Sequence, residues 1–137
     1  MKLHHVGYAV RDLDAAEAAF ARLGHQISAR TDDTVRQVRI SWAVLDGIRV
    51  ELVAPLSSGS PVDGVLDKLG PTPYHLCYQV PEIAGAISTL RADGYLPLSA
   101  PSPAPAIGGA LVVFLYSRVL GLIELVEIPH EREAHLG

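Results

Sequence analysis

The sequence predicts an α+β domain made of two tandem βαβββ modules, whose strands form a cupped, mixed sheet around a metal site. Three observations support this fold class. The chain repeats itself, and each copy carries the same order of strand and helix signals. Two histidines and two glutamates also occupy equivalent strand positions in the two copies.

Length and composition fit one folded domain over residues 1–137. Hydrophobic residues make up 49% of the 137 and charged residues 19%, which is typical of a globular chain. The net charge of −4 comes from scattered residues without a basic run, which argues against a nucleic-acid partner.

Three further features concern the compartment. The single cysteine, Cys77, excludes an intramolecular disulfide, and the first residues, "MKLHHVGYAVRDLD", lack the apolar core of a signal peptide. The longest apolar stretch, "ALVVFLY" at 110–116, is too short to cross a membrane. We therefore expect a cytoplasmic protein without a membrane partner.

The repeat becomes visible when "HHVGYAVRDLDAAEAAFARLGH" (4–25) is set above "YHLCYQVPEIAGAISTLRADGY" (74–95). This alignment pairs His5 with His75, Tyr8 with Tyr78, Val10 with Val80 and Gly24 with Gly94. Further along, "VELVAP" (50–55) matches "IELVEIP" (123–129), which pairs Glu51 with Glu124. An internal duplication of one βαβββ unit explains all of these coincidences.

The first module, about 3–54, begins with a strand that ends at Val10. A helix follows, with Asp12 or Asp14 as its cap and Gly24 as its end. Three strands are expected near 26–30, 38–45 and 48–53, and Asp46-Gly47 predicts a two-residue hairpin between the last two.

A linker helix at about 60–70, capped by Ser60 and stopped by Gly70, leads to the second module, about 73–128. There Pro81 is expected in the first turn of the helix that Gly94 ends. Strands are expected near 95–98, 110–116 and 121–127, and the Pro-rich "APSPAPAIGG" is expected to be an irregular loop.

Strand alternation turns His5 and His75 away from the helices, onto the same side as Glu51 and Glu124. A carboxylate between apolar strand residues is costly unless it is paired, hydrogen-bonded or bound to a metal. Two imidazoles and two carboxylates suit a divalent ion in octahedral geometry, with two positions left for substrate or water. The sequence therefore predicts one metal site made of these four residues.

Through the hairpin, Trp42 falls opposite Glu51 and shares its face. Ile40, Val44, Phe114 and Tyr116, where they share that side, suit an apolar or aromatic ligand. Cys77 is expected on the histidine side as a small buried thiol that fills space. His130 and His135 are expected to be solvated in the polar tail.

The four residues within paired βαβββ units resemble the vicinal oxygen chelate superfamily, which includes glyoxalase I, methylmalonyl-CoA epimerases, extradiol dioxygenases and fosfomycin-resistance proteins. Methylmalonyl-CoA epimerases are the most similar members, on "LHHVGYAVRDLDAA", "VELVAPLSSGSPVDGVLDKLG" before "YHLCYQV", and "IGGALVVFLYS" before "GLIELVE". The resemblance implies a divalent metal (Co, Ni, Mn, Zn or Fe) held by the four residues. It also implies a small substrate with adjacent oxygens, a coenzyme A thioester among them, and a homodimer.

That resemblance implies an epimerase or isomerase that removes a proton next to a carbonyl, with metal-stabilised enolate chemistry. Glu124 is the expected base, and Glu51 is its partner or a ligand. Two segments depart from the epimerase pattern. Thr34 or Val35 stands where those enzymes have a second catalytic glutamate, with only Asp32 and Asp33 nearby, and "YSR" (116–118) replaces a His-Pro-Lys stretch. Arg118 is nevertheless a candidate for contact with an anionic group.

Two alternatives remain open. A glyoxalase I-type isomerase or lyase shares the two-histidine, two-glutamate set. A non-catalytic binder, like the drug-resistance members of the superfamily, would use the same fold without chemistry. A ring-cleaving dioxygenase is disfavoured because that class uses two histidines and one carboxylate.

Overall fold

The computed structural model describes residues 1–129, and the predicted tail histidines His130 and His135 lie outside them. The chain divides into two compact units. The first unit is His5–Tyr74, and the second unit is Met1–His4 together with the residues from His75 onward. Among the described residues, no helix is both long and apolar enough to cross a membrane.

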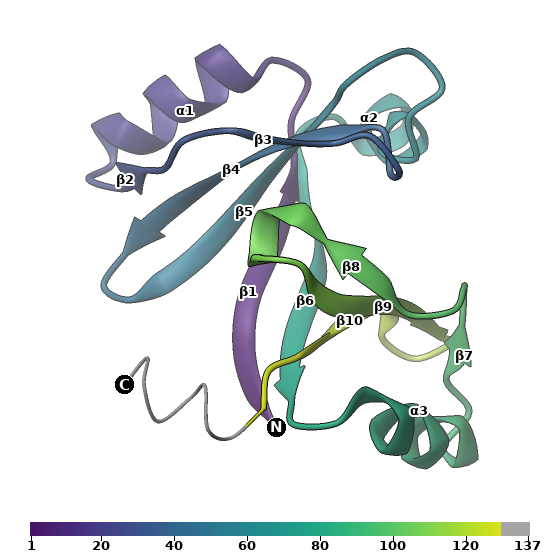
Figure 1. Cartoon of the computed structure of the whole chain (residues 1–137). Helices are drawn as coiled ribbons and strands as arrows, with labels where there is room; N and C mark the ends of the chain where they lie inside the picture. The colour runs from purple at the N-terminus through teal and green to yellow at the C-terminus, as the bar shows by residue number, and fades with distance from the viewer. Residues whose placement is uncertain (130–137) are drawn as a thin grey trace. The chain divides into compact units, whose positions relative to one another are not determined.

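The first unit follows the predicted order with one additional strand (Figure 1). Its elements are β1 (Lys2–Ala9, from His5 on), α1 (Leu13–Arg22), β2 (Gln26–Ile27), β3 (Thr31–Asp33), β4 (Val38–Leu45), β5 (Ile48–Pro55) and α2 (Asp63–Leu69). The strand order is β2-β4-β5-β1, and β3 also pairs with β4. β1 runs parallel to β5, and β4 runs antiparallel to it.

The second unit repeats this plan. Its elements are β6 (Thr72–Val80, from His75 on), α3 (Ile83–Ala92), β7 (Leu96–Pro97), β8 (Ser102–Ala104), the 3-10 turn η1 (Pro105–Ile107), β9 (Ala110–Ser117) and β10 (Gly121–Glu127). The strand order is β6-β10-β9-β7, and β8 pairs with β9. The parallel and antiparallel pairings match those of the first unit, so the predicted α+β class and mixed sheet are confirmed.

Each sheet has one face under its helix. In the first unit this helix face carries Ala43, Leu52 and Ala54, which pack against Val10, Leu13, Ala16 and Phe20. In the second unit Val113, Leu115, Ile123 and Leu125 pack against Ile83, Ile87 and Leu90. We call the opposite face, which carries His5 or His75, the site face.

Helix starts differ in part from the prediction. Asp12 caps α1 by accepting from the backbone N of Ala15 at 3.2 Å, so Asp14 does not serve as the cap. Glu82 caps α3, and Pro81 therefore precedes the helix instead of occupying its first turn. The linker helix begins only at Asp63, because the backbone N of Asp63 donates to the carbonyl of Ser60 in a turn that precedes the helix.

Two short strands lie where the sequence predicted none. β3 pairs with the beginning of β4, and β8 occupies the middle of the stretch predicted to be an irregular loop. Pro103 lies inside β8, where its ring removes a backbone donor, and a proline is tolerated in an edge strand. β8 is the counterpart of β3, so the proline-rich composition does not prevent the second unit from forming the same short strand.

Candidate metal and active site

A histidine–glutamate pair lies on the site face of the first unit. β1 and β5 are aligned so that Gly7 is opposite Glu51, which brings His5, two residues earlier on the same face, near the carboxylate. The Nε2 of His5 is 3.5 Å from Oε1 of Glu51, and both residues are buried. The edge of Trp42, opposite Glu51 on β4, meets the imidazole with ring centroids 5.0 Å apart.

The second unit carries the same arrangement. Cys77 on β6 is opposite Glu124 on β10, and the Nε2 of His75 is 3.2 Å from Oε1 of Glu124. Phe114 takes the place of Trp42, because it is opposite Glu124 and its ring centroid is 5.0 Å from that of His75. Both residues of this pair are also buried.

Both pairs bury an imidazole and a carboxylate at positions where hydrophobic packing alone would favour apolar side chains. Burying carboxylates and imidazoles costs free energy that apolar residues at the same positions would not cost. Imidazole nitrogen and carboxylate oxygen are the ligands that borderline divalent metals accept. Each unit thus supplies, from adjacent parallel strands, one nitrogen and one oxygen donor of the kinds that a divalent cation accepts.

The other predicted binding residues fall into three groups. In the first unit, Ile40 and Trp42 lie on the site face, opposite Val53 and Glu51. In the second, Phe114 and Tyr116 share the site face with Glu124, and Tyr116 is 46% exposed. Arg118 lies outside the strands, in the exposed turn between β9 and β10.

Cys77 is completely buried on the site face of the second unit. It belongs to an apolar cluster with Ala104, Ala110, Val112, Val126 and Ile128. This surrounding agrees with the expected space-filling role. It also makes the site face next to the His75–Glu124 pair apolar and built from small side chains.

The two acids of the segment before β4 point to different faces. Asp33 is opposite Val38 on the site face, whereas Asp32 is opposite Arg39 on the helix side and binds it at 2.6 and 3.0 Å. Asp33 is 2% exposed and accepts from Nη1 of Arg36 at 2.8 Å and from the backbone N of Arg36 at 3.0 Å. This buried ion pair was not predicted, although an aspartate three residues before an arginine in a turn is a signal for it.

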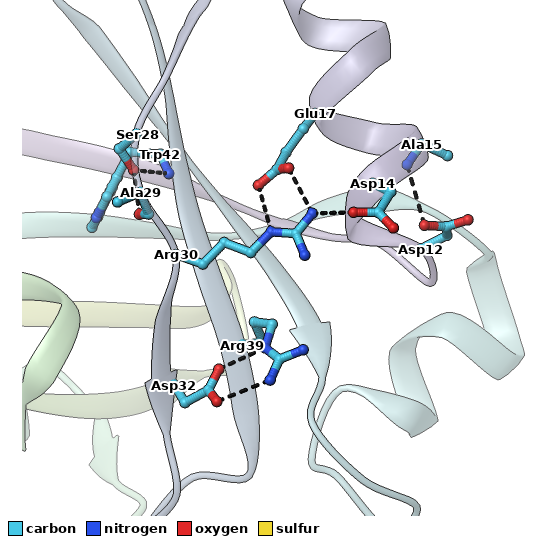
Figure 2. A network of polar contacts seen from close by, with 10 residues as sticks. All are labelled: Asp12, Asp14, Ala15, Glu17, Ser28, Ala29, Arg30, Asp32, Arg39 and Trp42. Atoms are coloured by element: carbon cyan, nitrogen blue, oxygen red, sulfur yellow. Dashed lines mark hydrogen bonds and ion pairs between the residues drawn. The ribbon is translucent and has the colours of Figure 1, made fainter.

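A second polar network holds α1 on its sheet (Figure 2). Arg30, between β2 and β3, donates to Glu17 on α1 at 2.7 and 3.1 Å and also contacts Asp14. The Arg30 guanidinium holds the pKa of the Glu17 carboxyl below its usual value, and the Arg39 guanidinium does the same for the pKa of Asp32. This network lies on the helix side of the sheet and stabilises the scaffold.

Glu127, three residues after Glu124 on β10, makes a structural contact. Its Oε2 accepts from the backbone N of Ile83 at 2.9 Å, at the start of α3. Glu127 and Glu82 thus satisfy separate backbone donors of the first helical turn. Glu127 therefore supports α3 and takes no part in the site.

Comparison with known proteins agrees with this geometry. The sequence profile of the glyoxalase/bleomycin resistance protein/dioxygenase superfamily matches residues 4–114. The chain belongs to this superfamily. The crystal structure of methylmalonyl-CoA epimerase from Mycobacterium tuberculosis is similar to this chain, with a TM-score of 0.82 and 27% sequence identity. The match covers 97% of this chain and 91% of that structure, so the two proteins share the fold over almost their whole length.

Curated relatives of this chain carry the epimerase name. The ethylmalonyl-CoA/methylmalonyl-CoA epimerase of Cereibacter sphaeroides is 33% identical over 132 residues, which are 93% of this chain and 98% of the relative. The mitochondrial methylmalonyl-CoA epimerase of Homo sapiens is 32% identical over 90% of this chain and 72% of the relative. The predicted likeness to methylmalonyl-CoA epimerases is confirmed, and this superfamily member is a homologue of epimerase enzymes.

Proposed function

We propose that this protein is a divalent-metal-dependent epimerase that inverts a carbon next to a thioester carbonyl, with methylmalonyl-CoA or a close analogue as substrate. The observation that carries the proposal is the repeated pair, His5 with Glu51 and His75 with Glu124, at equivalent strand positions of the two units. The epimerase relatives support the choice of reaction and of substrate class.

The metal part of the proposal assigns His5, Glu51, His75 and Glu124 as ligands of one ion. When bound, a divalent ion would supply Lewis-acid polarisation of the substrate carbonyl. The imidazoles would contribute nitrogen donors and the glutamates oxygen donors, and the negative charge on the ionised glutamate would offset part of the charge of the cation. Trp42 and Phe114 pack edge-on against the imidazoles and limit ring rotation, which would keep each Nε2 directed at its glutamate.

The proton-transfer part assigns Glu124 as base and Glu51 as its partner. A carboxylate oxygen of Glu124 takes the proton from the α-carbon, and the electron pair of the broken C–H bond moves toward the carbonyl oxygen. Glu51 would start this step protonated and give its proton to the opposite face of the carbon, which inverts it and leaves Glu51 as the carboxylate and Glu124 as the acid. One glutamate from each copy of the repeat would thus supply the two opposed groups that inversion requires.

The substrate-binding part assigns Ile40, Trp42, Phe114, Tyr116, Cys77 and Arg118. The apolar members would surround the acyl group and exclude water, while Arg118 would meet an anionic group of the thioester. The buried, small-residue cluster around Cys77 supports an apolar environment for a short acyl chain.

The compartment, the oligomeric state and the domain organisation are also part of the proposal. We place the protein in the cytoplasm as a homodimer, with the two units forming one domain. The single buried cysteine is consistent with a reducing compartment.

Solvent-deuterium exchange tests the proposed reaction. In D₂O the wild-type protein should incorporate deuterium at the α-carbon of methylmalonyl-CoA and interconvert its epimers. Glu124→Gln removes the base and should lower the exchange rate of one epimer at least 100-fold. Glu51→Gln should leave a slow exchange without inversion, because the proton can then return only to the face it left.

Glu127→Gln is the matched control, because Glu127 lies on the same strand as Glu124 and its carboxylate accepts from the backbone N of Ile83 at the start of α3. It should exchange deuterium at the wild-type rate. Wild-type protein that releases no α-proton from methylmalonyl-CoA would contradict the proposal, as would undiminished exchange by Glu124→Gln.

A further inference from the structure

Apolar side chains on the site face of the second unit continue outward from the proposed active site. Two residues along β9 from Phe114, Tyr116 is opposite Leu122 on β10. On its other side Tyr116 is opposite Leu96 of β7, the last strand in the sheet order. Side chains two residues apart on a strand point to the same face, about 7 Å apart along it. These three residues therefore form a row on the site face, next to the Phe114–Glu124 pair.

This row is open to solvent. Leu96 is 62% exposed, and Leu98, two residues later on the same face, is 59% exposed. The backbone N of Leu98 donates to the carbonyl of Phe114 at 2.9 Å, so Leu98 lies beside Phe114 as Leu96 lies beside Tyr116. We call Leu96, Leu98, Tyr116 and Leu122 the apolar strip. Apolar area in water costs free energy, and adjoining exposed apolar side chains often mark a ligand or partner surface.

The first unit is more polar at the equivalent positions. There Gln26 is opposite Val44, and Val44 is opposite Arg49. Ser28 takes the place of Leu98 beside the aromatic residue of β4, with the same backbone hydrogen bond. Because both units form the same strands with different residues here, the fold itself does not require the apolar strip.

We propose that the apolar strip binds the pantetheine arm of a coenzyme A thioester, and so directs the arm out of the site over the second unit. The inference rests on the proposed function, which places the thioester carbonyl beside the glutamates. The arm begins at the sulfur next to that carbonyl, and its methylene and methyl groups are apolar. An arm that extends from the carbonyl along β9 would meet the strip about 7 Å further on.

Two features of the strip suit this occupant. Its apolar side chains can cover the methylene and methyl groups, and the Tyr116 hydroxyl offers a hydrogen-bonding group to the amides of the arm. The strip also adjoins Phe114 and Glu124 without a break. This continuity favours the substrate itself over a second copy of the chain as the occupant.

Steady-state kinetics of Leu96→Gln and of the double variant Leu96→Gln/Leu98→Ser provide the test, because these changes introduce the residues of the first unit. With methylmalonyl-CoA, KM should rise about 3- to 10-fold in the single variant and further in the double variant, since apolar contact with the arm is lost. The change in kcat should be smaller. Leu69→Gln is the matched control, because Leu69 is a 71% exposed leucine at the end of α2. It should keep the wild-type KM.

Shortened substrates identify the part of the thioester that meets the strip. Methylmalonyl-pantetheine keeps the arm but lacks the nucleotide, and the methylmalonyl ethyl thioester keeps only the acyl group. The rise in KM should persist with methylmalonyl-pantetheine and shrink with the ethyl thioester. An equal rise with the ethyl thioester would assign the strip to the acyl group, and a rise confined to methylmalonyl-CoA would assign it to the nucleotide. Either result would overturn the inference, and so would an unchanged KM for all three substrates.

Direct binding distinguishes this inference from the reaction itself. Titration calorimetry with propionyl-pantetheine needs no turnover, so it remains informative if the wild-type protein releases no α-proton. Weaker binding to Leu96→Gln than to wild type and Leu69→Gln supports the inference. Equal binding by all three proteins, or binding by none, overturns it. A wild-type dimer that dissociates in Leu96→Gln, measured by analytical ultracentrifugation, would assign the strip to a second copy of the chain and also overturn it.

Discussion

Asp46 and Gly47 connect β4 to β5, and their backbone conformation positions both Trp42 and Glu51. Both residues have positive φ, 53° for Asp46 and 74° for Gly47, as the two-residue hairpin turn requires. The register between β4 and β5 follows from this turn, so it determines which residues share the site face with Glu51. The dipeptide is therefore the residue-level cause of one half of the site.

Gly47→Ala should destabilise the protein by about 1 kcal/mol, since a left-handed conformation strains any residue that has a Cβ. An added Cβ at Gly47 has no heavy atom within 4 Å, so the loss would come from the backbone and not from a clash. Chemical denaturation measures the change. Gly64→Ala is the control, because Gly64 is helical and equally open, and this variant should gain up to about 1 kcal/mol. Equal effects of both variants would refute the backbone explanation.

Some of the observed elements have a local signal in the sequence, and others do not. The hairpin, the helix-ending glycines and the long strands have local signals, and they lie where the sequence predicted them. β3 and β8 have three residues each, and their sequences, "TDD" and "SPA", carry no strand signal. They form because β4 and β9 offer them partners, which is a tertiary cause that single-sequence patterns do not contain.

Both helices pack on apolar strand residues, but they differ at one equivalent position. Beneath α3 the contacts are apolar, and Ile87 is part of them. On α1 the equivalent position is Glu17, which binds Arg30 (Figure 2). The first unit therefore relies on an ion-pair network where the second unit relies on hydrophobic packing.

The contribution of the Arg30–Glu17 ion pair to the free energy of unfolding should depend on pH. Because the folded-state pKa of Glu17 is lowered, the contact stabilises the fold above the unfolded-state pKa of glutamate, about 4.3, and this contribution is lost as pH falls through the folded-state pKa. Arg30→Gln should therefore unfold more easily than wild type at pH 7. The difference in unfolding free energy should decrease below about pH 4. A difference that is the same at pH 7 and pH 3 would exclude this linkage.

For the whole molecule, the duplication is the feature that singled out the four candidate ligands in one sequence. A single strand histidine or glutamate is usually explained by a hydrogen bond or an ion pair. Because these four residues occupy equivalent positions in the two copies, they indicated a common role as metal ligands. Contacts made by residues that differ between the two copies were missed, as with the Asp33–Arg36 ion pair and the contact of Glu127 with α3. Neither belongs to both copies, so the alignment of the halves gave no signal for them.

Metal removal should lower thermal stability if the four proposed ligands bind an ion. A ligand that binds only the folded state stabilises it by about 2.7 kcal/mol at a concentration 100 times its Kd. Treatment with a chelator should lower Tm by several degrees, and added divalent metal should restore it. Calorimetric scans with and without EDTA measure this shift, and identical scans would contradict a metal bound to the native protein.

The central claim is that both halves of the repeat serve one metal ion. Elemental analysis of dialysed protein tests it most directly, with wild type compared with His5→Ala and His75→Ala, each shown by circular dichroism to be folded. We predict one ion per chain in wild type and a large loss of metal in both variants, since each removes a ligand of the same ion. Two ions per wild-type chain, or full retention by either folded variant, would contradict the claim.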